Sequence, residues 1–215
     1  MKDLKTIFWD WNGTLLDDVR ECIDIINISL QKRSLKKLSL DDYLEKFTFP
    51  IKQYYENVGF DFSVESYEEA GREYIDAYST RMFECRLHQG VLAALKGFKQ
   101  MGMQQFILSA LHDGSLHQCI EHYALGGYFD KVCGLSDSYA HSKIELGRQL
   151  ILQAGCEKEL SLMVGDTVHD FETASAMGIR CVLIAAGHNS KDRLLACGVP
   201  VYENIEEFAG HLLAK

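Results

Sequence analysis

The feature that most constrains the fold is a regular alternation of helical and strand-like segments after Gly90. Apolar spacing predicts helices at residues 91–101, 114–124, 142–154, 168–177 and from about 205. Short apolar runs predict strands at residues 6–9, 105–109, 131–135, 160–165, 181–184 and 199–202. Such alternation is typical of a parallel sheet covered by helices on both faces. We therefore expect an α/β fold with a Rossmann-like parallel sheet of about five or six strands.

The segment from residue 17 to residue 85 interrupts this alternation. Strand-like runs are absent from it, and apolar residues recur at helical spacing, for example Ile23, Ile26 and Leu30. We therefore predict an α/β core made of residues 1–16 and 86–215, with an inserted α-helical cap at 17–85. The cap is expected over the carboxyl ends of the strands, the edge where open α/β sheets bind ligands.

Charge and composition exclude several classes of protein. The 215 residues carry a formal charge of -9, which does not suit a nucleic-acid binder. No apolar run is long enough for a transmembrane helix, and the start of the chain does not read as a signal peptide. The seven cysteines are scattered and never spaced as C-x-x-C, so we expect reduced thiols in a cytoplasmic protein. A monomer is the default expectation, with a dimer left open.

Three acidic residues follow predicted strands. Asp10 comes after the first strand, while Asp166 and Asp170 come after the strand at 160–165. If both strands are central, the three carboxylates meet at one edge of the sheet and could bind Mg²⁺. The alternative is that acids follow strands simply as turn formers or helix N-caps.

Two further positions suit a phosphate group. Ser109 ends a predicted strand, so its hydroxyl and the backbone N–H of Ala110 could hold phosphate oxygens. Lys143 lies at the start of a predicted helix, where the helix dipole and the ammonium group both favour an anion. Each signal is weak alone, because serines at strand ends and exposed lysines are common.

Taken together, these positions resemble the motifs of the haloacid dehalogenase-like (HAD) superfamily. Residues 8–17 read Phe-Trp-Asp-Trp-Asn-Gly-Thr-Leu-Leu-Asp, similar to the first motif hhhDxDGTLxD, in which h is apolar. Ser109 and Lys143 match the second and third motifs by position, and residues 165–170 match the fourth, GDxxxD. The layout is similar to the phosphoglycolate-phosphatase-like branch, which has a helical cap after the first motif.

The resemblance implies a magnesium-dependent phosphomonoester hydrolase acting on a small phosphorylated metabolite. Asp10 would be the nucleophile that forms an aspartyl-phosphate. Asp166, Asp170 and the backbone carbonyl of Asn12 would complete the Mg²⁺ site with Asp10. The transferring phosphate would be held by Ser109, Ala110 and Lys143, and Thr14 would support the loop or the phosphate.

Asn12 departs from the family pattern, which usually has a second Asp at this position to protonate the leaving oxygen and later activate water. An amide can do neither at neutral pH, and losing a positioned acid/base typically costs ~10²–10⁴-fold in rate. The enzyme could use a good leaving group, or His112 or His169 could supply the proton. The alternative function is a catalytically weak relative that binds a phosphorylated ligand or partner without efficient turnover. Dehalogenases and phosphonate-cleaving relatives match less well, because they usually have an aromatic or a small residue in place of Asn12.

Aromatic residues near the site leave two interpretations open. Trp11 could line the substrate entrance or pack in the core. The aromatic residues of the cap could shape a pocket or form the core of the cap: Tyr43, Phe47, Phe49, Tyr54, Tyr55 and Tyr67.

Overall fold

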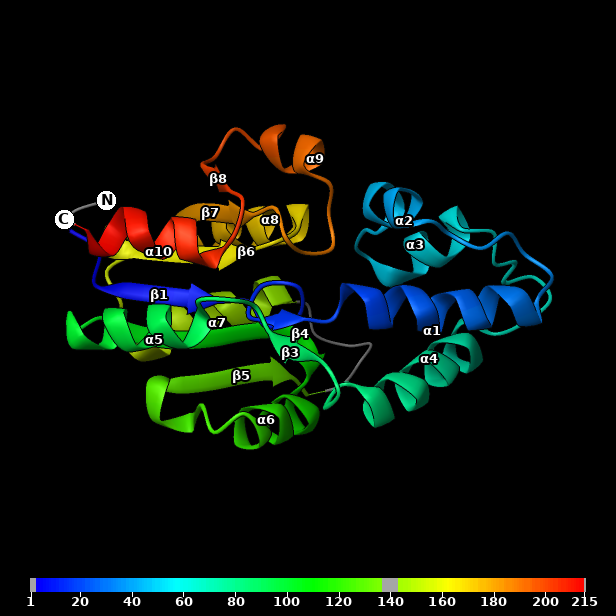
Figure 1. The fold of residues 1–215 in the computed structure, drawn as a ribbon, viewed down its shortest axis with the longest axis horizontal. Coiled ribbons are helices and arrows are strands. Elements are labelled where there is room, and N and C mark those ends of the chain that lie inside the picture. The colour runs from blue at the N-terminus through cyan, green and yellow to red at the C-terminus, as the bar shows by residue number, and fades with distance from the viewer. Residues whose placement is uncertain (1–2, 137–142, 215) are drawn as a thin grey trace.

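The computed structural model describes residues 3–136 and 143–214, and its centre is a single parallel sheet (Figure 1). The order of the six strands is β5-β4-β1-β6-β7-β8. Their bounds are Thr6–Trp9 (β1), Gln104–His112 (β4), Lys131–Leu135 (β5), Ser161–Gly165 (β6), Arg180–Ile184 (β7) and Val201–Tyr202 (β8). All five neighbouring pairs are parallel, which confirms the predicted Rossmann-like α/β fold.

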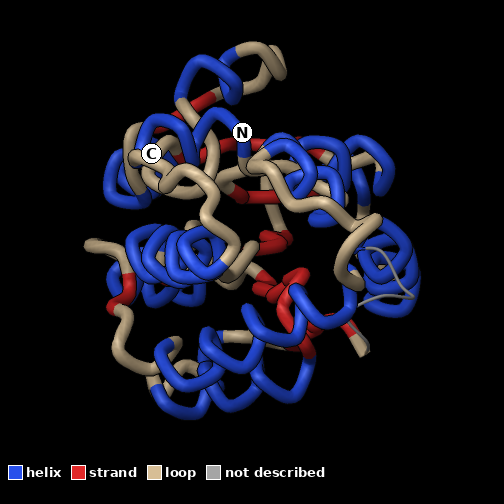
Figure 2. Tube along the Cα trace, turned by 90° about the vertical axis from the view of Figure 1, so that its right-hand side faces the viewer, coloured by secondary structure: helices blue, strands red, loops and turns tan. Residues whose placement is uncertain are grey.

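Helices cover both faces of the sheet, as Figure 2 shows from the cap end. One face packs against α5 (Val91–Gln100), α6 (Asp113–His122) and α10 (Ile205–Leu213). The other packs against α7 (Lys143–Ala154), α8 (Val168–Met177) and α9 (Lys191–Leu195). The side chains of β1 alternate between these layers, because successive residues of a strand point to opposite faces. Every residue of β1 is buried, as expected for a central parallel strand.

Four helices lie beyond the carboxyl ends of the strands and form the cap (Figure 1). Their bounds are Val19–Lys32 (α1), Leu40–Lys46 (α2), Ile51–Asn57 (α3) and Tyr67–Arg81 (α4). The chain leaves the core through β2 (Leu16–Asp17) and returns through β3 (Arg86–Leu87), and these two strands pair antiparallel. A two-stranded ribbon therefore joins the cap to the core.

The sequence patterns missed only short elements. Neither the β2–β3 ribbon nor the five-residue helix α9 was predicted, because periodicity cannot be read over two to five residues. Helix α8 matches the predicted 168–177 at both ends, whereas β4 runs three residues beyond the predicted 109. Gly155 follows α7 in a left-handed conformation with φ of 63°, as expected of a helix stop. Ser142, the expected N-cap of this helix, lies outside the described residues.

The core continues into the cap without a break. Trp11, Leu15 and Leu16 are fully buried and belong to the same apolar cluster as Tyr43 and Tyr54 of the cap. Trp11 therefore packs in the core, and it does not line the substrate entrance. The shared cluster fixes the cap against the sheet edge through apolar burial.

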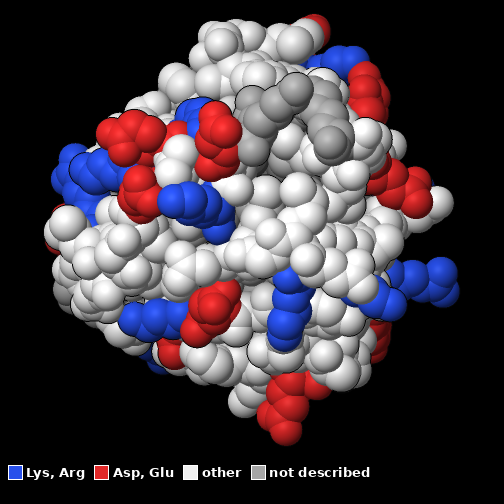
Figure 3. All heavy atoms as spheres, turned by 90° about the vertical axis from the view of Figure 1, so that its left-hand side faces the viewer, with Lys and Arg blue, Asp and Glu red and all other residues white. Residues whose placement is uncertain are grey.

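The charged surface and the state of the cysteines can be compared with what the composition predicted. At the end of the molecule remote from the cap, acidic and basic side chains are interspersed (Figure 3). All seven cysteines are free thiols. Within residues 3–136 and 143–214, no helix is long and apolar enough to cross a membrane.

The buried amide of Gln105 provides a test of this packing. Its Oε1 accepts a hydrogen bond from Trp9 Nε1 at 3.1 Å, and its Nε2 donates to the Leu95 carbonyl at 2.9 Å. Gln105→Leu leaves the Trp9 indole N–H buried and unpaired, whereas the Leu95 carbonyl keeps its hydrogen bond within α5, so the free energy of unfolding should fall by about 1–3 kcal/mol. Denaturant unfolding followed by circular dichroism measures the change.

The matched control is Gln100→Leu on the exposed side of α5, which should change stability by less than about 0.5 kcal/mol. Equal stabilities of the Gln105→Leu variant and the native chain would contradict the proposed importance of this hydrogen-bonded pair.

Candidate active site

The register of the sheet brings the predicted site residues together. Trp9 of β1 pairs with Ile107 of β4 on one side and with Val164 of β6 on the other. Asp10 directly follows Trp9. Ser109 lies two residues after Ile107, and Asp166 lies two residues after Val164. The three side chains therefore meet at the carboxyl edge of the sheet, which faces the cap.

Three carboxylates and one ammonium group form the centre of the site. Oxygens of Asp10, Asp166 and Asp170 lie within 4.8 Å of one another, and all three residues are buried. Lys143 Nζ contacts the Asp10 carboxylate and lies 2.5 Å from Asp170 Oδ1. One ammonium cannot balance three carboxylates, and an all-oxygen donor set is what a hard divalent cation prefers. These residues therefore fit a metal ion of the Mg²⁺ type.

The pKa values of the site reflect this crowding of charge. Burial raises the pKa of Asp10 well above its ordinary value, and the opposite charge of Lys143 offsets this only in part. Burial also raises the pKa of Asp166. Lys143 keeps its proton, because its two carboxylate partners raise its pKa although burial alone would lower it. A divalent cation among the carboxylates would favour their ionised forms.

Asp170 is both a helix cap and a member of the site. Its Oδ2 accepts hydrogen bonds from Thr167 N at 3.0 Å and Thr167 Oγ1 at 2.7 Å, which closes a capping box at the start of α8. Its Oδ1 faces Lys143. Burial would raise the pKa of Asp170, but Lys143 and these donors hold it below its ordinary value. Asp170 therefore takes part in capping α8, while its role as a Mg²⁺ ligand stays a prediction.

Two glycines let the backbone approach these carboxylates closely. A Cβ on Gly13 would stand 2.3 Å from Asp166 Oδ2, and Gly13 has a φ of 73°. A Cβ on Gly165 would stand 2.2 Å from Asp170 Cγ. Side chains at these positions would displace the carboxylates.

Thr14 supports the carboxylates rather than the phosphate position. Its Oγ1 donates to Asp166 Oδ1 at 2.7 Å and lies 3.4 Å from Asp10 Oδ2. The threonine is fully buried. It therefore joins the loop after β1 to the acid at the end of β6.

The phosphate-binding residues predicted from sequence lie beside the nucleophile. Ser109, Ala110 and Lys143 all line the same cavity as Asp10. Ser109 is buried, and its Oγ accepts a hydrogen bond from Leu111 N at 3.1 Å, which leaves its hydroxyl proton available. His112 also lines the cavity, from the exposed end of β4.

The Asn12 amide is held by a network that the sequence did not predict. Its Nδ2 donates to Asp18 Oδ2 at 2.7 Å and to the Tyr78 hydroxyl at 2.5 Å. Tyr78 in turn donates to Asp18 Oδ2 at 2.7 Å. Both amide hydrogens therefore have acceptors, so Asn12 cannot donate to a leaving oxygen without breaking these bonds.

Asp18 also connects the cap to the core. Its Oδ1 lies 3.2 Å from His188 Nε2, while His188 Nδ1 lies 2.8 Å from the Tyr43 hydroxyl. Burial would raise the pKa of Asp18, but the charge and hydrogen bond of His188 outweigh it and leave the pKa lowered. The pKa of His188 rises to about 9, because the effect of Asp18 exceeds that of burial. The two residues form a buried ion pair at neutral pH.

The first motif contains a partial signal for Asp18, and no motif points to His188. The first motif aligns with Asp17, but Asp17 is exposed and Asp18 is the buried acid. Strand alternation after the buried Leu16 would have directed attention to Asp18. His188 lies in a loop beyond β7, where no pattern indicates burial.

The cavity in front of Asp10 extends into the cap and has a volume of about 250 Å³. The six aromatic residues considered from sequence all line it, and so do Tyr74 and Tyr78. The ring of Phe49 stacks on His169 with 4.5 Å between centroids. Burial is the largest influence on His169, and its pKa is lowered. The cap aromatics thus form the wall of a pocket as well as part of the cap core.

Comparison with known proteins assigns the family. Residues 7–184 match the model of a haloacid dehalogenase-like hydrolase. The chain belongs to the haloacid dehalogenase-like hydrolase family. A 5'-nucleotidase of Pseudomonas aeruginosa is 26% identical to this chain over 198 residues. The match covers 88% of this chain and 86% of the nucleotidase. A phosphoglycolate phosphatase of Mesorhizobium japonicum is 24% identical over 193 residues, covering 86% of this chain and 84% of that protein.

Solved structures of the family share the fold along the whole chain. The crystal structure of a predicted phosphatase from Clostridium acetobutylicum superposes with a TM-score of 0.83 at 20% identity. The superposition covers 99% of both chains. It therefore places the cap and the core of this hydrolase in the same architecture as that protein.

The Asn12–Asp18 contact predicts the effect of restoring the usual acid. Asn12→Asp would put a second carboxyl group about where Nδ2 now lies, 2.7 Å from Asp18 Oδ2. Burial and the like charge of Asp18 should raise the pKa of the new carboxyl in the folded state. When this carboxyl is ionised, the free energy of unfolding of the variant should be about 1–3 kcal/mol lower than that of the native chain. A carboxyl whose pKa is higher in the folded state than in the unfolded state destabilises the fold once the pH exceeds its unfolded-state pKa. The loss of stability should therefore be largest near pH 8 and should shrink toward pH 5.

Chemical unfolding of the variant and the native chain from pH 5 to pH 8 measures this deficit. Asn57→Asp, at an exposed position of the cap, is the control and should show a small change that does not grow with pH. A deficit that is absent or constant across this pH range would contradict the like-charge argument.

Proposed function

We propose that the protein is a magnesium-dependent phosphomonoester hydrolase of small phosphorylated metabolites, with Asp10 as its nucleophile. The observation that carries the proposal is the position of Asp10. It lies at the sheet edge against Lys143, beside Asp166 and Asp170, and it faces the cavity that extends into the cap. The relatives named 5'-nucleotidase and phosphoglycolate phosphatase support phosphate ester chemistry at this site.

In the first step, a carboxylate oxygen of Asp10 attacks phosphorus and forms an aspartyl-phosphate. Lys143, the hydroxyl of Ser109 and the backbone N–H of Ala110 would hold the phosphate oxygens and stabilise the charge that develops on them. The bond from phosphorus to the leaving oxygen breaks, and its electron pair goes to that oxygen. Mg²⁺, held by Asp10, Asp166 and Asp170 with the Asn12 carbonyl, would supply charge neutralisation between the two anions.

The second step returns the enzyme to its starting state. A water oxygen attacks phosphorus, the bond to Asp10 breaks, and inorganic phosphate leaves. Asn12 cannot take a proton from this water, because an amide is not a base at neutral pH. Its Oδ1 can still accept a hydrogen bond from the water. We therefore expect the second step to be slow compared with that of relatives that have a carboxylate at this position.

Among the described residues, neither Asn12 nor His188 is available to protonate the leaving group. Asn12 donates its amide hydrogens to Asp18 and Tyr78, and the two ring nitrogens of His188 face Asp18 and Tyr43. We propose that the leaving oxygen takes its proton from water. The alternative donors, His112 and His169, also line the cavity, and the comparison of esters below separates these two sources. Esters whose leaving group is stable as an anion should therefore react much faster than alkyl esters.

Replacing the nucleophile tests the mechanism. Asp10→Asn should lower turnover of an aryl phosphate with Mg²⁺ by at least about 10³-fold, since the amide cannot attack phosphorus. Chelation with EDTA should abolish turnover by the native enzyme, and added Mg²⁺ should restore it. The control Asp17→Asn, at the exposed neighbour of Asp18, should retain native activity. Undiminished turnover by Asp10→Asn would overturn the assignment.

Leaving-group dependence tests the missing acid. We expect kcat/KM for 4-nitrophenyl phosphate to exceed that for benzyl phosphate by at least about 10²-fold, the low end of what a positioned acid contributes. Both leaving groups are aromatic and uncharged, so their fit to the cavity is similar. Equal rates for the two esters would show that another group donates the proton. If the native chain bound phosphate but hydrolysed neither ester, the alternative of a binding protein without turnover would hold.

A further inference from the structure

The cavity contains two ends of different chemistry. At one end, Asp10, Ser109 and Lys143 surround the position where a phosphate would bind. The other end reaches into the cap and is lined mainly by aromatic rings and aliphatic side chains, including Phe47, Phe49, Tyr55, Tyr74, Ile75 and Met82. The leaving group of a substrate attacked by Asp10 must occupy this second end.

The cap end offers no cation to an anionic leaving group. Among the described residues that line the cavity, Lys143 is the one Lys or Arg, and its ammonium already faces Asp10 and Asp170. Asp18 lies buried on the cap side, and its charge is already paired with that of His188. A carboxylate on the leaving group would therefore lose its hydration without gaining a partner, which is costly.

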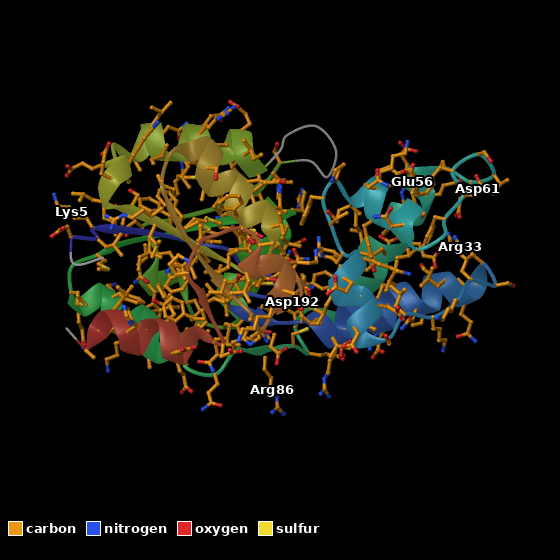
Figure 4. The ribbon with its side chains drawn as sticks, turned by 90° about the horizontal axis from the view of Figure 1, so that it is seen from above. Lys5, Arg33, Glu56, Asp61, Arg86 and Asp192 are labelled. Carbon is orange, nitrogen blue, oxygen red and sulfur yellow. The ribbon has the colours of Figure 1, made fainter. Side chains whose placement is uncertain are left out.

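The basic residues of the cap point elsewhere. Arg33 lies toward the outer end of the cap (Figure 4) and pairs with Glu65 at 2.6 Å and Glu73 at 3.2 Å. Arg81 pairs with Glu21 at 2.6 Å. None of these residues lines the cavity. The ion pairs therefore stabilise the exterior of the cap and leave the cavity wall apolar.

The histidines that line the cavity do not supply a free positive charge at the cap end. His188 is held between Asp18 and Tyr43, and its charge is compensated by Asp18. His169 stacks on Phe49 and lies 3.2 Å from Glu172. His112 belongs to β4, three residues beyond Ser109, and so lies at the phosphate end.

The aromatic surfaces favour a planar ligand. The rings of Phe47 and Tyr54 lie 5.2 Å apart in an edge-to-face arrangement, and those of Tyr74 and Tyr78 are parallel at 6.1 Å. Flat π-faces and edges of this kind pack best against another aromatic ring. An aliphatic leaving group would fill the same space with fewer favourable contacts.

We infer that the substrate is a phosphomonoester whose leaving group is an uncharged aromatic moiety. This inference rests on the proposed function, because it assigns the occupant of the cavity in front of Asp10. An aryl or arylmethyl group and a nucleoside share this chemistry. Small esters with a carboxylate on the leaving group, such as phosphoglycolate, are poor substrates.

The test compares four esters that all have a primary alkyl leaving oxygen, so that leaving-group basicity is similar. With Mg²⁺, benzyl phosphate represents a simple aromatic group and uridine 5'-monophosphate a nucleoside. Glycerol 1-phosphate is uncharged but not aromatic, and phosphoglycolate is anionic. We expect kcat/KM for one or both aromatic esters to exceed the values for glycerol 1-phosphate and phosphoglycolate by at least about tenfold.

The four esters also distinguish an aryl leaving group from a nucleoside leaving group. A preference for benzyl phosphate over uridine 5'-monophosphate assigns the cavity to an aryl leaving group, and the reverse assigns it to a nucleoside. Turnover of phosphoglycolate or glycerol 1-phosphate at least equal to that of both aromatic esters would overturn the inference but leave the proposed function intact. No turnover of any ester, nor of 4-nitrophenyl phosphate, would instead refute the proposed function.

A designed variant tests the charge argument directly. Ile75 lines the cavity on α4 and is 43% exposed, so Ile75→Arg adds the missing cation at a position that tolerates a long side chain. We expect this variant to raise kcat/KM for phosphoglycolate by about tenfold, with no gain for benzyl phosphate. Ile28→Arg, at a 51% exposed position of α1 outside the cavity lining, is the control and should change neither value. An unchanged phosphoglycolate rate in a folded Ile75→Arg variant would contradict the charge argument.

Discussion

The contact between the Lys143 ammonium and the Asp10 carboxylate is the interaction around which the molecule is arranged. Both groups are buried, and burying charged groups is costly unless they are paired and hydrogen-bonded. The register of β1 between β4 and β6 supplies the pairing, because it brings acids from two strand ends to the helix that begins with Lys143. Glycines at positions 13 and 165 then let the backbone approach these acids closely. The parallel sheet therefore brings three carboxylates together, and one ammonium group cannot neutralise them. The remaining negative charge suits a divalent cation.

The network around Asn12 shows how a second buried acid changes the chemistry of the first motif. Asp18 accepts hydrogen bonds from Asn12, Gly13 and Tyr78 and is paired with His188. A carboxylate in place of Asn12 would face Asp18 across a hydrogen-bond distance in a buried site. The amide removes this repulsion and fixes the loop after the nucleophile. The acid/base group that would usually help both chemical steps is absent as a consequence.

Much of the sheet and its acidic edge could be predicted, because the signals are local. An apolar run that ends in an acid marks β1 and β6, and helical spacing gives both ends of α8. The partners of Asp18 could not be predicted in this way. His188 is 170 residues away in sequence, and its contact depends on the path of the loop beyond β7. The role of the cap aromatics also stayed open, because periodicity shows that a helix is amphipathic but not whether its apolar face meets a core or a cavity.

The central claim is that Asp10 takes the phosphoryl group in a site whose second step lacks a base. Rapid acid quenching during turnover of 4-nitrophenyl phosphate with Mg²⁺, followed by peptide mass spectrometry, tests it most directly. The account predicts a phosphorylated peptide containing Asp10 that accumulates to a large fraction of the enzyme, because formation of the intermediate is faster than its hydrolysis. The same peptide from Asp10→Asn should carry no phosphate. Turnover by the native enzyme without phosphate on Asp10 at any quench time, or with phosphate on another residue, would contradict the account.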